Sequence, residues 1–199
     1  MLIDAKNASH DEMYKLLIGS VLPRPIAWVG SRDANGVDNL APFSFFNVAS
    51  TNPPVVSISI SNKPSGEPKD SLKNILETKY FSVSIVSHDM REIMHKCGTA
   101  FEAEVDEFTE LDIKKAECRH IDAPKVAAAK VSFECKFRHL HEFGAQSASH
   151  LILADILYIE VDDEIIDYPK IDMQKLDAVG RGSGPNYVTT RDSFSLIRK

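Results

Sequence analysis

A lysine, an aspartate and a serine stand side by side at Lys69, Asp70 and Ser71, where a polar loop gives way to an apolar repeat. The spacing of Leu72 and Ile75 predicts that a helix begins there. A helix N-terminus with a hydroxyl and a cation suits a phosphate, because its first N–H groups have no partners within the helix. The same residues also suit an ordinary helix start, in which Asp70 or Ser71 is the cap and Lys69 a solvated charge. In either case we expect Asp70 to cap the helix rather than contact phosphate, because like charges repel.

Alternating apolar and polar residues predict the strands that must position this helix start. Val56, Ile58 and Ile60 alternate with serines, so Ser59 and Ser61 share one strand face just before the loop and could add hydroxyls to the same site. The same pattern predicts strands over 26–31, 81–85, 131–141 and 150–161, and another over 37–46 that Pro42 interrupts.

Helix signals are fewer than strand signals. Ser9-His-Asp-Glu12 is a capping box and predicts a helix that ends near Gly19. Further helices are expected over 70–76 and 89–97, whereas 101–126 is irregular and the glycines of 180–184 predict a loop-like tail. About six strands with few helices favour a mainly β fold, an antiparallel barrel with helical decorations.

The composition favours a single globular domain over residues 1–199. The chain weighs 22.1 kDa and 43% of its residues are hydrophobic, enough to build a core. A net charge of −6 without a basic cluster argues against nucleic acid as a partner. No apolar run approaches the ~20 residues of a membrane span, so no membrane association is expected.

Targeting and cysteine signals point to the cytoplasm. The N-terminus lacks a basic and then apolar leader, and the three cysteines are scattered, so we expect a reducing compartment without disulfides. His139 and His141 share a strand face, but no metal-ligand spacing accompanies them, and no metal site is expected.

An ordered set of short motifs runs through the chain. These are Pro23-Arg-Pro-Ile-Ala-Trp-Val-Gly-Ser31, Asn39-Leu-Ala-Pro-Phe-Ser-Phe-Phe-Asn47, Asn52-Pro-Pro54, Lys69-Asp-Ser71 with Asn74, Ala123-Pro124, and Arg181-Gly-Ser-Gly-Pro-Asn-Tyr187. In this order, over about residues 10–190, they resemble the flavin reductase-like family of FMN-binding split barrels. Flavoredoxin and the reductase component of nitrilotriacetate monooxygenase are the members they resemble most. The resemblance implies an antiparallel Greek-key split β-barrel, FMN at a homodimer interface, and NAD(P)H as a substrate.

The resemblance also implies which residues hold the cofactor. It assigns the flavin ring to Asn39, Ala41, Pro42 and Ser44, and the phosphate to Ser59, Ser61, Lys69, Ser71 and Asn74. A flavin needs a flat apolar slot with a few polar groups at its edge, and segment 39–47 supplies both kinds of residue. Because Pro42 has no N–H, we expect it to interrupt strand pairing and free neighbouring backbone groups. Without the resemblance, 39–47 also suits an edge strand with a proline and buried phenylalanines.

Many short members of this family open a late strand with Gly-Asp-His, and that histidine lies near the nicotinamide and the flavin. Here the triplet is Ala148-Ser149-His150, so only the histidine matches. The resemblance makes His150 the candidate catalytic residue, positioning the nicotinamide. The alternatives are a half-exposed strand-end histidine and a buried structural one.

The implied function is that of an NAD(P)H-dependent FMN reductase. Hydride would pass from the nicotinamide to the flavin, and reduced FMN would then serve a monooxygenase or another electron acceptor. One alternative is a flavoredoxin-like electron carrier that holds FMN and turns over little free NAD(P)H. A third hypothesis is a split-barrel dimer that has lost its flavin.

Overall fold

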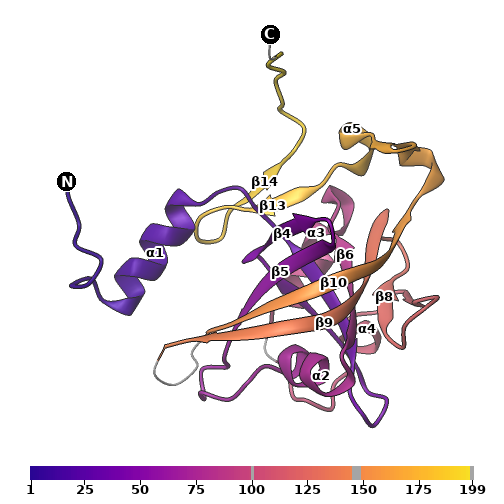
Figure 1. Ribbon diagram of the computed structural model, residues 1–199, viewed down its shortest axis with the longest axis horizontal. Helices are drawn as coiled ribbons and strands as arrows, with labels where there is room; N and C mark the ends of the chain where they lie inside the picture. Colours follow the sequence, from indigo (N-terminus) through magenta and orange to yellow (C-terminus); the bar gives the residue numbers. More distant parts are fainter. Residues whose placement is uncertain (100, 145–148, 198–199) are drawn as a thin grey trace.

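Seven antiparallel strands form the main sheet of the computed structural model, which describes residues 1–99, 101–144 and 149–197. They lie in the order β3, β2, β6, β9, β10, β5, β4; β4, β5, β6, β9 and β10 are labelled in Figure 1. Their bounds are Ala27–Arg32 (β2), Asp38–Phe43 (β3), Phe46–Thr51 (β4), Pro54–Ser61 (β5), Tyr80–Ile85 (β6), Val131–Phe143 (β9) and Ser149–Val161 (β10). The sheet curls until β3 contacts β5, which produces a barrel. The predicted mainly antiparallel β architecture is confirmed.

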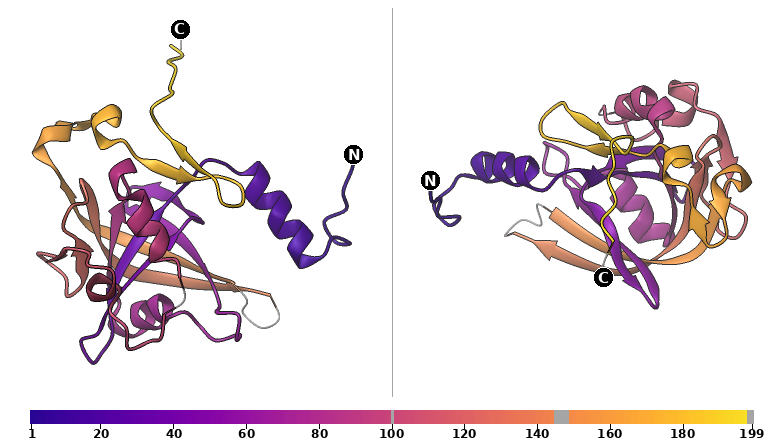
Figure 2. Two further views of the ribbon diagram at one scale, coloured as in Figure 1. Left: turned by 180° about the vertical axis from the view of Figure 1, so that it is seen from behind. Right: turned by 90° about the horizontal axis from the view of Figure 1, so that it is seen from above.

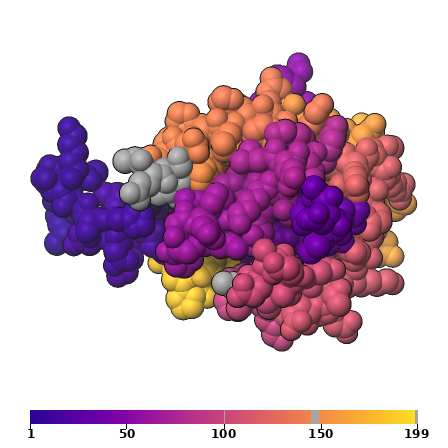
Figure 3. Space-filling view, turned by 90° about the horizontal axis from the view of Figure 1, so that it is seen from below, coloured from indigo at the N-terminus to yellow at the C-terminus, as the bar shows by residue number. Residues whose placement is uncertain are grey.

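The core of the barrel follows from the alternation along its strands. On β5, Val56, Ile58 and Ile60 are fully buried, and the serines between them lie on the opposite face. Helix α2 (Asp70–Thr78) adds the fully buried Leu72 and Ile75 to the same cluster. Burial of each such side chain contributes about 1.5–3 kcal/mol. Figure 3 shows the face of the molecule that α2 covers. The packing of Leu72 and Ile75 in the core fixes the position of the start of α2, which follows Lys69.

A second apolar cluster covers the outer face of β2 and β3. Trp28 and Leu40 pack there against η1 (His88–Met90), α3 (Arg91–Lys96) and α4 (Glu107–Glu110). All residues of β2 except the last are buried, because both faces of the strand are covered. The segment that appears irregular in the sequence therefore brings α4 beside β3.

Pro42 does not interrupt strand pairing, which corrects the expected break. Strand β3 continues through it to Phe43, and Pro42 lies opposite Trp28 of β2. The N–H of Leu40, two residues earlier on the same side of this edge strand, donates outward to Glu107 instead of to β2. The N–H that proline lacks would point outward too, so no bond to β2 is lost.

Helix α1 (His10–Ser20) begins at the predicted capping box. Ser9 Oγ accepts from the N–H of Glu12, and the Glu12 carboxylate accepts from the N–H of Ser9. The helix stands away from the barrel in Figures 1 and 2, and Ile18 is its buried residue. This end of the chain therefore leaves most of its apolar side chains exposed.

The C-terminal segment, expected to be loop-like, instead adds strands. β13 (Val179–Arg181) pairs with β14 (Tyr187–Thr189) and with β1 (Arg24–Pro25). A Cβ on Gly180 would lie 3.0 Å from the Cβ of Pro23, so this glycine permits a close approach of two backbones. Beyond β14 the chain extends away from the body in Figure 1.

Short elements complete the described structure. β7 (Lys115–Glu117) pairs with β8 (Pro124–Val126), and β11 (Ile166–Asp167) with β12 (Lys170–Ile171); η2 (Asp163–Ile165) and α5 (Met173–Leu176) flank the second pair. Within the described ranges, every helix is too short or too polar to cross a membrane.

Candidate functional site

Helix α2 is capped at Lys69, not at Asp70 or Ser71. Lys69 has extended backbone angles, and its side chain makes no capping hydrogen bond. Asp70 is the first helical residue, and its carboxylate lies 2.7 Å from Lys63 Nζ and 3.5 Å from Lys73 Nζ. The expectation that Asp70 or Ser71 caps the helix is therefore wrong. The carboxylate of Asp70 instead stabilises the first turn through the helix dipole and two lysines.

Lys69 differs from these two lysines because its charge meets no carboxylate in the described part of the chain. The side chain is half-buried, and its Nζ lies 5.5 Å from the centre of the Phe43 ring. Burial lowers the pKa of this ammonium group because the charged form loses hydration. The first-turn N–H groups of Asp70 and Ser71 have no acceptor within the helix. A half-buried cation beside two such amides suits an anion.

A chain of hydrogen bonds links α2, β3 and α4. Ser71 Oγ donates to Asn39 Oδ1 at 2.6 Å, and Asn39 Nδ2 donates to Glu107 Oε1 at 2.6 Å. The second oxygen of Glu107 accepts from the N–H of Leu40 at 2.8 Å. Burial raises the pKa of the Glu107 carboxyl, although its hydrogen bonds oppose the shift.

The structure thus brings two predicted residues, Asn39 and Ser71, into direct contact, and adds beyond Asn39 a carboxylate, Glu107, that the sequence did not reveal. Glu107 lies in the irregular middle of the chain, where no periodicity marks a buried acid. Its only local signal is Asp106, which caps the short helix α4.

The other predicted phosphate residues lie in separate places. Asn74, one turn along α2, is buried against β2, where its Nδ2 donates to Ser31 Oγ at 3.3 Å. Ser59 Oγ lies 2.8 Å from Ser149 Oγ on β10, and Ser61 is exposed. Asn74 therefore joins helix to barrel, and the two serines lie on the outer face of β5. Their contacts with phosphate remain predictions.

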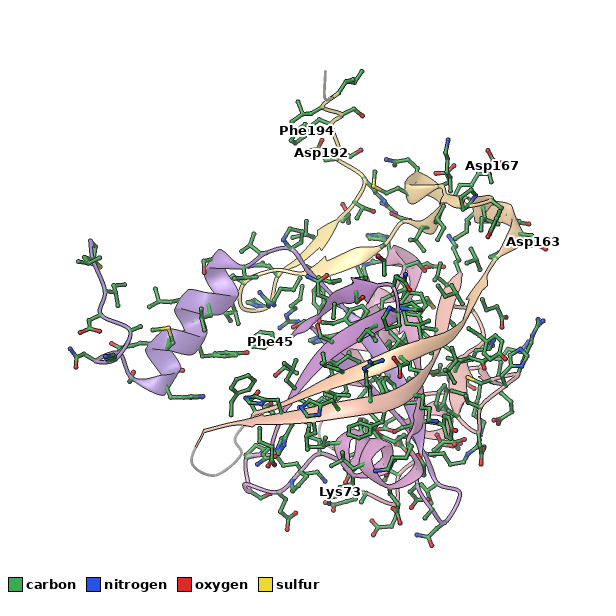
Figure 4. All side chains as sticks on the ribbon, viewed as in Figure 1. Phe45, Lys73, Asp163, Asp167, Asp192 and Phe194 are labelled. Carbon is green, nitrogen blue, oxygen red and sulfur yellow. The ribbon has the colours of Figure 1, made fainter. Side chains whose placement is uncertain are left out.

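The predicted ring residues lie on β3 and just beyond it. Ala41 packs against the barrel core, and Pro42 faces the outer cluster from the edge strand. Ser44 lines a groove of about 300 Å³ together with Phe45 and with Leu17 of α1. Figure 4 shows Phe45 on the side of the barrel that faces α1. This groove has the apolar walls that a flat ligand needs, and the ring contacts remain predictions.

Arg24, from the Pro-Arg-Pro motif, joins both termini to the barrel. Its Nη1 donates to the carbonyl oxygens of Ile18 at 2.8 Å and Val21 at 2.9 Å, and its Nη2 to that of Gly182 at 2.9 Å. The guanidinium also lies 5.9 Å from the centre of the Phe45 ring. The motif itself predicts no role for this arginine, because its partners are backbone atoms that carry no sequence signal.

His150 is buried, with 4% of its surface exposed, opposite Ile60 of β5. Its Nε2 donates to Asn62 Oδ1 at 2.8 Å, and its Nδ1 lies 3.5 Å from Glu142 Oε1. The half-exposed strand-end alternative is therefore wrong, because β5 and β9 flank β10 on both sides. A role toward the nicotinamide remains a prediction. Ala148, from the same triplet, lies outside the described residues.

The remaining histidines and cysteines are dispersed. The described ranges contain no group of three histidine, cysteine or acidic side chains placed to hold a metal ion. His120 stacks on Tyr158 with 3.7 Å between ring centres, while His139 and His141 are exposed. Cys97, Cys118 and Cys135 are free thiols.

Comparison with known proteins accounts for this architecture. Residues 18–173 match the model of the flavin reductase like domain. The chain belongs to the flavin reductase-like family. Its barrel is the split barrel of that family, as the sequence motifs implied. An uncharacterized protein from Aquifex aeolicus is 40% identical over 184 residues, which cover 92% of each chain.

Three solved structures show how far the likeness extends. Nitrilotriacetate monooxygenase component B from Bacillus cereus has a TM-score of 0.94 at 29% identity over 98% of each chain. The 2-nitrobenzoate 2-nitroreductase from Pseudomonas fluorescens has a TM-score of 0.90 at 30% identity, over 100% of this chain and 96% of that one. Flavoredoxin of Desulfovibrio vulgaris (Miyazaki F), at 20% identity and a TM-score of 0.77 over 98% and 97%, shares the fold.

Proposed function

We propose that this flavin reductase-like chain binds FMN and transfers hydride to it from NAD(P)H. The observation that carries the proposal is Lys69, a half-buried cation without a carboxylate partner in the described ranges. Burying an unpaired charge is unfavourable, and an anion bound beside it would remove the penalty. The terminal phosphate of FMN would suit this place, because the free first-turn N–H groups of α2 would donate hydrogen bonds to it as well.

The residues of the chain bind and orient the reactants. When bound, the flavin supplies the redox chemistry by accepting hydride at N5. Lys69 and the amides of Asp70 and Ser71 would hold the phosphate, and segment 39–44 would lie against the ring. His150, whose ring is oriented by its bond to Asn62, would position the nicotinamide. No acid or nucleophile is required, because hydride transfer depends mainly on alignment of donor and acceptor.

We also propose that the active form is a homodimer. Tyr14, Leu17, Val21 and Leu22 lie on or just after α1 and are 47–60% exposed on a helix that stands away from its own barrel. A second copy would cover these side chains and the groove beside Phe45. The name of the Bacillus cereus protein, a monooxygenase component, supports a monooxygenase as one recipient of reduced FMN.

An anaerobic titration of the FMN-loaded protein with NADH and NADPH tests the function. Bleaching of the flavin absorbance on addition of either nucleotide is the expected result. FMN that stays oxidised under excess nucleotide, yet bleaches with dithionite, would favour the electron carrier. Failure to bind FMN would exclude both and favour a dimer that has lost its flavin.

A further inference from the structure

Three side chains from three separate elements, two of them buried and Asn39 partly buried, form a single hydrogen-bonded relay. It runs from Ser71 of α2 through Asn39 of β3 to Glu107 of α4, with 2.6 Å between the bonded atoms at each step. Ser71 and Glu107 are 2% and 5% exposed. At the far end, the N–H of Leu40 occupies the second carboxylate oxygen of Glu107 at 2.8 Å.

The ionised state of Glu107 fixes the direction of every bond in this relay. A carboxylate can only accept hydrogen bonds, so Asn39 must turn its NH₂ group toward Glu107. The amide oxygen of Asn39 then faces Ser71, and the single hydroxyl proton of Ser71 is donated to it. In this state the Ser71 hydroxyl presents only lone pairs to any further partner.

This direction is unsuited to the phosphate site proposed above, on which the present inference rests. Phosphate oxygens accept hydrogen bonds, so lone pairs on Ser71 would repel them. Rotating the Ser71 hydroxyl toward phosphate alone would leave the partly buried amide oxygen of Asn39 without its donor, which is unfavourable. One proton on Glu107 removes the conflict. Protonated Oε1 then donates to Asn39 Oδ1, Asn39 Nδ2 donates to Ser71 Oγ, and the Ser71 proton is free for phosphate.

We propose that Glu107 is a positioning residue for the phosphate site, and that binding of a phosphate anion at Ser71 is coupled to uptake of a proton by Glu107. The proton comes from solvent, and no bond other than the carboxyl O–H forms. In both states the Leu40 N–H keeps its acceptor on Glu107, so the relay reverses without leaving a backbone group unpaired.

The surroundings of Glu107 favour this uptake. Burial is the main cause that raises its pKa, and the neighbouring charge of Asp106 raises it further. The bonds from Leu40 of β3, its own backbone N–H and Asn39 act in the opposite direction. Cys97, which follows α3, lies close enough for Glu107 to raise the pKa of its thiol, and this thiol carries no positive charge. An anion at Ser71 would favour the protonated acid still more.

The test compares FMN affinity in the wild-type protein and Glu107→Gln between about pH 6 and pH 9. A glutamine amide donates to Asn39 Oδ1 while its oxygen accepts from Leu40, so this variant holds the relay in the phosphate-ready direction. Wild-type affinity should fall with rising pH by up to about tenfold per unit relative to Glu107→Gln. Calorimetry in buffers of different ionisation enthalpy should show uptake approaching about one proton per FMN in the wild type, and less in the variant.

Controls separate this role from a structural one. Riboflavin, which lacks phosphate, should bind both proteins with the same pH dependence. Ser71→Ala should bind FMN more weakly and lose the difference in proton uptake. Glu110→Gln, on the exposed side of α4, should behave as the wild type.

The possible failures are distinct. If FMN binds with the same pH profile and proton uptake in wild type and Glu107→Gln, the relay is wrong and the proposed function stands. A loss of FMN and riboflavin affinity together, with a lower melting temperature and an unchanged pH profile, would show that Glu107 is only structural. If neither protein binds FMN at any pH, the proposed function fails and the relay fails with it.

Discussion

Asp38 and Asn39 are neighbours on β3, yet they enter two polar clusters of opposite character. Asp38, 3% exposed, pairs with Arg32 at 2.7 Å and also with Lys115. Arg32 in turn bonds Glu117 at 3.0 Å and pairs with Asp122. Around Asn39, the acid Glu107 is buried and the cation Lys69 is half-buried, and neither meets an opposite charge among the described residues.

We propose that this difference separates structural polar groups from those of the proposed ligand site. In the Asp38 cluster every charge is compensated, and the carboxylates raise the pKa of Arg32. In the Asn39 cluster burial shifts both titratable groups toward their neutral forms. Buried groups of this second kind are what a ligand site needs, since an arriving anion meets a cation that is not already paired. Substitutions in the two clusters should therefore have different effects.

The largest effect is expected at Asp38. Asp38→Ala removes the buried carboxylate that Arg32 and Lys115 share. The loss of this partner should lower the free energy of unfolding by about 3 kcal/mol. Denaturant unfolding measures the change, and FMN affinity of the folded protein should be unaffected. Asp122→Ala is the matched control, because that side chain is 80% exposed and should change stability little. An Asp38→Ala protein as stable as the wild type would remove the distinction drawn here.

His150 is an intermediate case, buried and hydrogen-bonded to an amide. If it positions the nicotinamide, His150→Ala should slow flavin reduction on the order of 100-fold, since misalignment affects hydride transfer steeply. FMN affinity should hardly change, while the melting temperature should fall because a buried ring is lost. Anaerobic stopped-flow reduction beside a thermal melt measures both, with His139→Ala as control, because that side chain of β9 is exposed. An unchanged hydride-transfer rate would place His150 among the structural residues.

Lys69→Ala should weaken FMN binding by at least about tenfold, since a charge-assisted bond to phosphate contributes roughly 1.5–3 kcal/mol. Riboflavin affinity should stay the same, and stability should not fall, because the cation has no carboxylate partner to lose. Fluorescence titration with both ligands measures this. Lys73→Ala, which removes a lysine paired with Asp70 on the same helix, is the control. Equal weakening of FMN and riboflavin would show that Lys69 does not contact phosphate.

The smallest effect is expected at the cysteines. Burial raises the pKa of the Cys97 and Cys118 thiols to about 12. The fraction of each cysteine that is in the reactive thiolate form increases as the pH rises toward that value. At pH 8 this fraction is only about one part in 10⁴. Brief iodoacetamide treatment at that pH should therefore leave both thiols unmodified by mass spectrometry and FMN affinity unchanged. Rapid alkylation of the folded protein would show that these side chains open readily to solvent.

Local signals in the sequence determined most of the secondary structure. The alternation at 56–60 identified β5, and the capping box at Ser9 placed the start of α1, because both depend on neighbours only a few residues apart. The order of motifs identified the family, and the fold followed from it. The strand and the helix start can be predicted from the sequence because the period of a strand and the cap of a helix are properties of the local chain.

Tertiary structure alone decided which polar groups are paired. Asn39 meets Ser71 32 residues away and Glu107 68 residues away, a relation that no local pattern encodes. The lysines at 63 and 69 look alike in sequence, yet one pairs with Asp70 and the other lies over the Phe43 ring. Pro42 was expected to break a strand, and its tolerance depends on β3 being an edge. The sequence determined where strands and helices form, whereas burial and pairing of charges depend on contacts that exist only once the barrel has closed.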